Sequence, residues 1–330
     1  MSIQNFIRVS QVILLGLLIF VGCKDNPVSD DGFSVETGPI LFISDKSGSY
    51  QLYSMNEDGS NVQQLTNDPN FPILDASWSP DGKKIAVVSL VGDESTYPFY
   101  RYAIFIMDAY GRNRYQLTQQ YVYVDDPVYG KLTYAGALHP VWSPDGKQIA
   151  YSRLMVPEAI GNRDIFVINI DGSNELRITS TINFFERIWD WGGKNQAILA
   201  SAMPWTPYSK ILMYTPDGNV LRTWEGDSLG FKCMAYSSKG DKVAYVVDFY
   251  PASLAHQDSM FVEDLDSGAI KNITKGTART YWVVCWSPDD SSILVSVSNR
   301  VLILNSDGSD LKDITPFESK VLSPVSWRRR

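Results

Sequence analysis

The 330-residue chain has few of the residues that build metal sites, disulfide frameworks or nucleic-acid contacts. It contains 2 histidines and 3 cysteines, with no Cys-x-x-Cys pair and no His-rich cluster, so we expect no metal site. The net charge of −8 argues against a nucleic-acid partner, because affinity for phosphate backbones depends on clustered Lys and Arg. No Gly-rich phosphate loop follows a strand and opens a helix, and no cofactor is predicted.

Long hydrophobic runs are also missing. Residues 12–21 form an apolar run of ten, which is too short to span a hydrocarbon core about 30 Å thick. The run follows Arg8, as in a secretory signal, and ends in Phe20-Val21-Gly22-Cys23. This ending resembles the lipobox of bacterial lipoproteins, in which the cysteine is lipidated and becomes the mature N-terminus. We therefore expect a lipoprotein signal peptide over residues 1–22, lipidation of Cys23 and a polar, flexible tether over residues 23–37. The alternative is an ordinary signal peptide with an incidental cysteine.

A repeated motif dominates the rest of the sequence. Trp-Ser-Pro-Asp-Gly-Lys-Lys-Ile-Ala begins at Trp78, and Trp-Ser-Pro-Asp-Gly-Lys-Gln-Ile-Ala begins at Trp142. Weaker copies and a last isolated tryptophan start at Trp189, Tyr236, Trp286 and Trp327. Self-similarity at a period of about 40–50 residues indicates a repeat architecture.

Each copy is interpreted as four strands. Proline presets φ in the Ser-Pro-Asp-Gly turn and glycine accepts the positive φ that closes a hairpin. The middle strands are apolar on both faces, as expected for sheets covered on both sides. A second turn contains glycine at positions 59, 111, 172, 218, 268 and 308, and the fourth strand ends in Leu-Thr or Ile-Thr. We expect the aspartates of these turns to accept hydrogen bonds from their own backbone.

The two ends of the repeat region complement one another. The first unit starts at Gly38 without a Trp strand, whereas Pro324–Trp327 is a Trp strand with nothing after it. The sequence therefore predicts an all-β fold over residues 38–330, a six-bladed β-propeller with four-stranded antiparallel blades. The C-terminal strand would join the first blade and close the ring, which removes an open sheet edge.

Residues 38–328 resemble the TolB-type propeller repeat, a WD40-like repeat written loosely as Trp-Ser-Pro-Asp-Gly-x-x-Ile-Ala, then Ile-Tyr-Val-Met-Asp-x-Asp-Gly, then Leu-Thr. The repeat occurs in the periplasmic translocation protein TolB, in prolyl-oligopeptidase-like peptidases and in many lipoproteins of unknown role. True TolB has an α/β domain before the propeller, and here only the tether precedes the first unit. The resemblance implies the fold and leaves a role in the Tol system in doubt.

Long insertions fall between the second and third strands and between units, which places them at one end of a propeller. They carry the candidate ligand-binding residues, which are Tyr97, Tyr100, Tyr121, Tyr123, Tyr129, Tyr134, Trp205, Tyr208 and Tyr250. Loops on a rigid scaffold concentrate function, and Tyr and Trp are enriched in binding hot spots. We predict that this face binds a protein, peptide or glycan. The alternative is that these aromatic side chains pack among themselves.

Apparent catalytic signals are weak. Gly226-Asp227-Ser228-Leu229-Gly230 matches Gly-x-Ser-x-Gly, but no helix pattern follows it, as the nucleophile elbow requires. No catalytic residues are predicted. His139 is expected to be a loop or packing residue, and Cys233 and Cys285 are expected to be buried and unbridged.

These observations predict a non-enzymatic binding protein of the cell envelope. It would be secreted across the inner membrane and lipid-anchored, at the outer membrane facing the periplasm or at the cell surface, with no nucleic-acid partner. The alternatives are a propeller hydrolase or lyase with an active site at the channel mouth, and a structural part of an envelope assembly. Three or more converging His, Asp or Glu side chains in the channel would favour an enzyme.

Overall fold

The computed structural model describes residues 37–91, 102–119, 121–126, 130–156, 163–181, 184–204, 210–225, 229–249, 257–274, 281–297, 299–317 and 321–328. All of them belong to one compact unit, Thr37–Arg330. The predicted signal peptide, the lipidation site at Cys23 and the tether up to Glu36 lie outside the described residues. Within those ranges, no helix has the length and apolar character needed to cross a membrane.

Backbone hydrogen bonds group the strands into five sheets. The first joins the two ends of the unit, in the order β25 (Val321–Trp327), β1 (Ile40–Ser44), β2 (Gln51–Met55) and β3 (Gln63–Gln64). The second contains β4 (Ile73–Trp78), β5 (Lys84–Leu90), β6 (Tyr102–Asp108) and β7 (Tyr115–Gln116). Two more four-stranded sheets contain β17 (Leu229–Tyr236), β18 (Lys242–Phe249), β19 (Gln257–Asp264) and β20 (Ile270–Asn272), then β21 (Tyr281–Trp286), β22 (Ser292–Val297), β23 (Arg300–Asn305) and β24 (Lys312–Asp313).

The remaining strands form one nine-stranded sheet. Its members are β8 (Tyr121–Asp126), β9 (Gly130–Trp142), β10 (Gln148–Val156), β11 (Arg163–Asn169), β12 (Leu176–Arg177), β13 (Phe184–Gly192), β14 (Ala197–Pro204), β15 (Lys210–Tyr214) and β16 (Val220–Trp224). The prediction of six separate four-stranded blades is therefore wrong: four such blades are present, beside this larger sheet. There are two reasons. First, residues that we expected in a loop form the hairpin β8–β9. Second, β11 pairs in parallel with β13 at Arg163↔Phe185.

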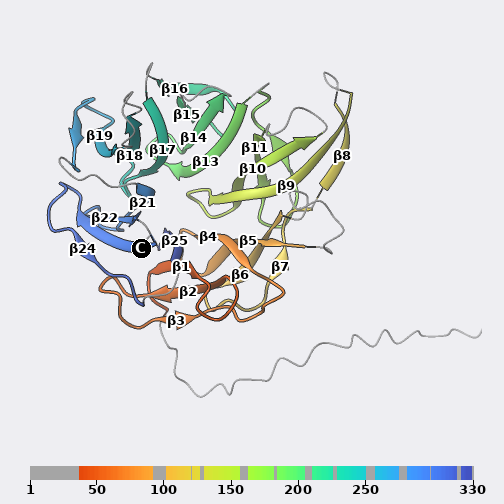
Figure 1. Ribbon diagram of the computed structural model, residues 1–330. Coiled ribbons are helices and arrows are strands. Elements are labelled where there is room, and N and C mark those ends of the chain that lie inside the picture. Colours follow the sequence, from red (N-terminus) through yellow and green to blue (C-terminus); the bar gives the residue numbers. More distant parts are fainter. Residues whose placement is uncertain are drawn as a thin grey trace, which may run out of the picture. The chain divides into compact units, whose positions relative to one another are not determined.

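The pairing of the C-terminal strand with the first sheet is as predicted. Strand β25 runs antiparallel to β1, with Ile40 opposite Trp327, and the Arg328 N–H donates to the Pro39 carbonyl at 2.8 Å. The strands β4, β9, β13, β17, β21 and β25, called the inner strands from here on, contact one another in that order, and β25 contacts β4. Figure 1 shows them near the centre of the unit. The inner strands therefore form a closed cycle.

The apolar middle strands are covered on both faces, as their composition predicts. Ile85, Val87 and Phe105 of the second sheet pack against Leu41 and Leu52 of the first. On the opposite face, Ala86, Val88 and Ile104 pack against residues of β9 and β10. Each sheet is thus stabilised by its neighbours rather than by a single central core.

The tryptophans of the repeated motif form hydrogen bonds from one sheet to the next. The Trp142 indole N–H donates to the Ser77 carbonyl at 3.0 Å, and the Trp286 indole donates to the Ala235 carbonyl at 3.1 Å. Both bonds run to the residue that precedes the equivalent aromatic position of the neighbouring inner strand. The tryptophan of the motif is therefore a bridge between sheets as well as an apolar side chain.

The second turn and the Leu-Thr ending have matching roles. A Cβ placed on Gly111 would lie 2.1 Å from the Leu65 carbonyl oxygen, so this turn must present glycine to the preceding sheet. The Thr66 hydroxyl, one residue further along, accepts from the Leu52 N–H at 2.9 Å. Equivalent bonds, each 14 residues apart in sequence, are made by Thr118, Thr179, Thr274 and Thr315. The expected aspartate turns are also present, for example Asp58 accepting from the Ser60 N–H at 2.9 Å.

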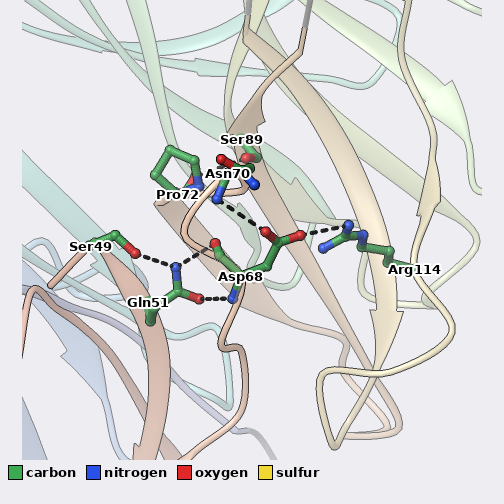
Figure 2. A network of polar contacts seen from close by, with 7 residues as sticks. All are labelled: Ser49, Gln51, Asp68, Asn70, Pro72, Ser89 and Arg114. Carbon is green, nitrogen blue, oxygen red and sulfur yellow. Dashed lines mark hydrogen bonds and ion pairs between the residues drawn. The ribbon is translucent and has the colours of Figure 1, made fainter. Parts of the chain in front are cut away.

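The connection from β3 to β4 is held by polar side chains (Figure 2). The Gln51 amide donates to the Asp68 carbonyl at 2.9 Å and accepts from the Asp68 N–H at 3.2 Å. The Asp68 carboxylate pairs with Arg114 at 3.0 Å and accepts from the Asn70 N–H. Ser89 donates to the Pro72 carbonyl at 2.8 Å. This network orders one crossing between sheets at the end of the unit opposite the Ser-Pro-Asp-Gly turns, called the loop end from here on.

Candidate binding site in the central channel

A cavity of about 240 Å³ lies between the inner strands. All six inner strands contribute to its wall, and the aromatic side chains that line it are Trp78, Trp142, Trp189, Tyr236, Trp286 and Trp327. The charged or titratable residues of the wall are Asp75, His139, Arg187, Asp190 and Cys285. The cavity is therefore a channel to whose wall each inner strand contributes one aromatic residue, together with a small set of charged groups.

A register irregularity recurs in every inner strand and helps to place these groups. The pairing with the neighbouring strand shifts between Ile73 and Asp75 in β4, and between Ile188 and Asp190 in β13. Similar shifts occur in β9, β17, β21 and β25. A bulge bends its strand and re-aims the side chains beside it. Here the bulges lie beside channel-lining residues such as Asp75, His139 and Trp189.

The histidine of the channel is held by a carboxylate. His139 has a φ of 56° at the bulge of β9, and its Nδ1 lies 3.0 Å from Asp75 Oδ2. Burial, and then the positive charge of Arg187, lower the pKa of His139 to about 4, against the opposing effect of Asp75. The imidazole is therefore neutral at pH 7. Nδ1 then carries the proton and donates to Asp75.

Two arginines lie on the same side of the β11–β13 junction. The Arg187 guanidinium stacks over the Trp189 ring at 4.0 Å, and the Arg163 guanidinium stacks over the Phe185 ring at 3.9 Å. The Nε atoms of both are buried and have no hydrogen-bond partner in the described part of the chain. Burial and the charge of Arg187 lower the pKa of Arg163 to about 10, and burial also lowers the pKa of Arg187. The guanidinium groups are therefore supported by rings and repel each other.

The adjacent residues on the same two strands are acidic. Asp164 is buried and accepts from Arg177 Nε at 2.8 Å. Glu186 is buried and accepts hydrogen bonds from the hydroxyls of Thr179 and Tyr214. Burial raises the pKa of Glu186 to about 7, and the charge of Asp164 contributes in the same direction. Because successive side chains alternate along a strand, the junction has a basic face and an acidic face.

Strand β17 carries a basic residue in a different setting. Lys232 lies at the bulge of β17 and pairs with Asp258 at 2.8 Å and Asp248 at 3.1 Å. Cys233 beside it is buried and free, and burial raises the pKa of its thiol. Cys285 also forms no disulfide with it, is only half-buried, and lines the channel. The expectation of two unbridged cysteines is confirmed, although Cys285 is not fully buried.

The predicted aromatic site falls mostly outside the described residues. Tyr97, Tyr100, Tyr129, Trp205, Tyr208 and Tyr250 are not described. Tyr121 and Tyr123 belong to β8, and Tyr134 belongs to β9, so they are part of a hairpin rather than a loop. In its register Tyr121 is opposite Ala135 and Tyr134 is opposite Val122. Whether these residues bind a ligand stays a prediction.

The sequence reasoning missed the arginines and misplaced one repeat. Trp191, not Trp189, is opposite Ile198 and so corresponds to Trp78, which is opposite Ile85. With that register, Arg187 is four residues before the aromatic position, where the other copies have Leu74, Leu138, Lys232, Trp282 and Ser323. A basic residue at this inner-strand position was the available signal. His139, expected in a loop or in packing, lies instead in β9 on the channel wall.

Comparisons with known proteins support the fold. No family model matches the chain. It is 31% identical over 140 residues to the Protein TolB homolog of Chlorobium chlorochromatii, covering 36% of this chain and 32% of that protein. It is 28% identical over 134 residues to the Tol-Pal system protein TolB of Anaeromyxobacter dehalogenans, covering 40% of this chain and 25% of that protein. The chain therefore spans about a third or less of the length of these relatives.

Similarity to a solved structure extends over more of the chain. The crystal structure of TolB from Acinetobacter baumannii superimposes with a TM-score of 0.66 at 19% identity, covering 89% of this chain and 67% of that one. At this identity the likeness concerns the fold. The sequence relatives, the superposition and the closed cycle of inner strands agree that this chain has a TolB-like β-propeller fold.

Proposed function

We propose that the protein is a binding protein of the bacterial cell envelope, which docks an extended segment of another protein at its loop end and in its channel. The observation that carries the proposal is the channel wall, to which all six inner strands contribute an aromatic residue and in which a partly buried guanidinium stacks on Trp189. Trp, Tyr and Arg are the residues that dominate binding hot spots, because they bury a large area and offer directed hydrogen bonds. An extended segment has the width that a cavity of about 240 Å³ admits, whereas a folded domain does not.

The enzyme alternatives gain no specific support from the channel. Within the described ranges, no three His, Cys, Asp or Glu side chains converge as a metal site. The comparisons favour a protein partner, because the printed name of one relative assigns it to the Tol-Pal system. A glycan partner has no comparable support.

A cross-linking experiment tests the docking. A photoreactive amino acid placed at Tyr121, in the loop-end hairpin, is expected to give a covalent adduct with an envelope protein in living cells. Tyr110 is the matched control, because it is an exposed tyrosine in the β6–β7 turn at the opposite end. The adduct at position 121 should fall several-fold when Trp205 is changed to alanine. No adduct at 121, or equal adducts at both positions, would remove the docking proposal.

The proposal includes export and a lipid anchor at Cys23. Cys23→Ala is expected to move the protein from the membrane fraction to the soluble fraction, because one thioether-linked lipid group is then missing. Fractionation followed by immunoblotting measures the shift. Cys285→Ala is the control, since it removes a thiol elsewhere in the chain and should leave the protein in the membrane fraction. Retention of the Cys23→Ala variant in membranes would contradict the anchor.

A further inference from the structure

The junction of β11 and β13 holds two partly buried arginines that lack the carboxylate partner usual for such a cation. Arg163 and Arg187 make no ion pair within the described ranges, and both buried Nε atoms lack a hydrogen bond. Leaving a buried charge without a counter-charge is costly, and proteins normally pair it. Stacking on Phe185 and Trp189 keeps the guanidinium groups in place but does not satisfy the two buried Nε–H donors.

Lys232 shows that this arrangement is not a general feature of the channel. It occupies the same inner-strand position as Arg187, four residues before the aromatic residue, but it is neutralised by Asp248 and Asp258. The nearest carboxylate to act on Arg187 is Asp75, and its Oδ2 is engaged with His139. Asp190, the other carboxylate of the wall, accepts from the N–H groups of Trp191 and Tyr236. The basic residue of β13 therefore lacks the partner that its counterpart in β17 has.

The charges around this point favour a singly charged anion. Asp75 is the one carboxylate among the described residues whose charge acts on Arg187, and His139 is neutral, so the four groups Arg163, Arg187, Asp75 and His139 together carry one net positive charge. A guanidinium presents parallel N–H donors that match the two oxygens of a carboxylate. A phosphate dianion would leave an uncompensated negative charge beside Asp75.

We propose that Arg187, assisted by Arg163, forms a subsite in the channel for a carboxylate, supplied by an Asp or Glu side chain or the C-terminus of the docked segment. This inference rests on the proposed function for the identity of the ligand, and it specifies that function: the segment that enters the channel is acidic at the point that reaches β13.

Thermal unfolding of the purified full chain with small probes tests the subsite. N-acetylglutamate, used as its α-methylamide so that the side-chain carboxylate is its one charge, is expected at a tenfold excess over its dissociation constant to raise the Tm by about 3 °C, the shift that such saturation gives a domain of this size. N-acetylglutamine, also used as its α-methylamide, has the same shape without the charge and should give no shift. Sodium chloride at equal ionic strength controls for screening, and O-phosphoserine, with its amine acetylated and its carboxylate converted to the methylamide, tests the preference for a carboxylate over a phosphate.

Variants assign the effect to the arginine. Arg187→Gln should abolish the response to N-acetylglutamate, and Arg187→Lys, which keeps a charge but loses the paired donors, should weaken it several-fold. Arg112→Gln removes the same charge from the exposed β6–β7 turn and should leave the response unchanged. If Arg187→Gln does not fold, Arg187→Lys and Arg163→Gln carry the test.

The outcomes separate this inference from the docking proposal. An equal response in Arg187→Gln, a response to N-acetylglutamine, no response to N-acetylglutamate, or a stronger response to O-phosphoserine would overturn the carboxylate subsite. The cross-link at position 121 does not depend on these probes. A cross-link that persists in Arg187→Gln without loss, together with a failed probe test, would leave the docking proposal standing and remove the subsite.

Discussion

Two contacts between neighbouring groups of strands, called joints from here on, differ in the residues that form them. Between the β4–β7 sheet and strands β9–β10, the joint is apolar, and the Trp142 indole bridges it to Ser77. Between strands β11 and β13 an apolar cluster that includes Ile165 and Ile188 is also present. This joint adds a backbone pair, a bond from the Ile188 N–H to the Ser152 hydroxyl, and charged side chains on both faces. The indole of Trp191 does not cross this second joint, because it donates to Gln196 in its own turn.

This difference between the two joints indicates at which positions the sequence repeat can vary. At the apolar joint, the Trp142 indole has a hydrogen-bond partner and Ile149 has apolar partners in the neighbouring sheet, so these letters recur. At the β11–β13 joint the motif lacks its proline and its tryptophan bonds within its own turn, while charged residues precede it on both faces of β13. Functional residues in proteins often occupy the places where local rules are broken. The unpaired arginines lie at the joint that departs furthest from the repeat.

The largest expected effect is on an apolar joint. Gly111→Ala would place a Cβ 2.1 Å from the Leu65 carbonyl oxygen, in addition to the strain of a φ of 79°. We expect a loss of roughly 3 kcal/mol in the free energy of unfolding. Gly268 is the matched control, because its φ is 72° in the equivalent turn but nothing lies within 4 Å of its Cβ position. Gly268→Ala should cost about 1 kcal/mol, the strain alone. Equal costs in urea denaturation would show that the contact with Leu65 does not stabilise the joint.

The charged joint should make the free energy of unfolding depend on pH. Burial raises the pKa of Glu186 from 4.5 to about 7, so the folded protein keeps a proton that the unfolded chain releases. The contribution of Glu186 is therefore complete below pH 4.5 and is lost as the pH rises through 7, by about 3 kcal/mol at most. Glu186→Gln should remove this pH dependence. Its free energy of unfolding, compared with that of the original protein, should therefore be more favourable at pH 8 than at pH 5. Urea denaturation at several pH values measures it.

The control for that prediction is Glu57→Gln, which removes an exposed carboxylate from a turn. Its stability should follow the same pH dependence as the unmodified protein. If Glu186→Gln also keeps the full slope between pH 5 and 8, the buried acidic face of the joint does not titrate in this range, and the comparison between the joints loses its electrostatic basis.

The sequence predicted the parts of the fold that depend on local rules. The turn glycines have positive φ, and Asp290, which replaces a turn glycine, has a φ of 63° as its side chain allows. The pairing of Trp327 with Ile40 followed from the missing strand of the first unit. The nine-stranded sheet did not follow, because one parallel pair at Arg163↔Phe185 and an inserted hairpin have no sequence signature of their own. The channel arginines were missed for a related reason: β13 contains two tryptophans, and only the register shows that Trp191, not Trp189, occupies the motif position.

The smallest expected effect isolates a single hydrogen bond. Trp142→Phe removes the indole donor and leaves the Ser77 carbonyl without it, whereas Trp327→Phe removes an indole N–H that has no partner in the described part of the chain. Both tryptophans are 5% exposed, so the loss of ring volume is matched. We expect Trp142→Phe to cost about 1 kcal/mol more than Trp327→Phe, the net value of a buried hydrogen bond. Denaturant titrations of both variants give the difference directly. If Trp327→Phe were the more costly change, the tryptophan would act in the apolar joint through its ring alone, and the bridge to the next sheet would not explain why the residue recurs.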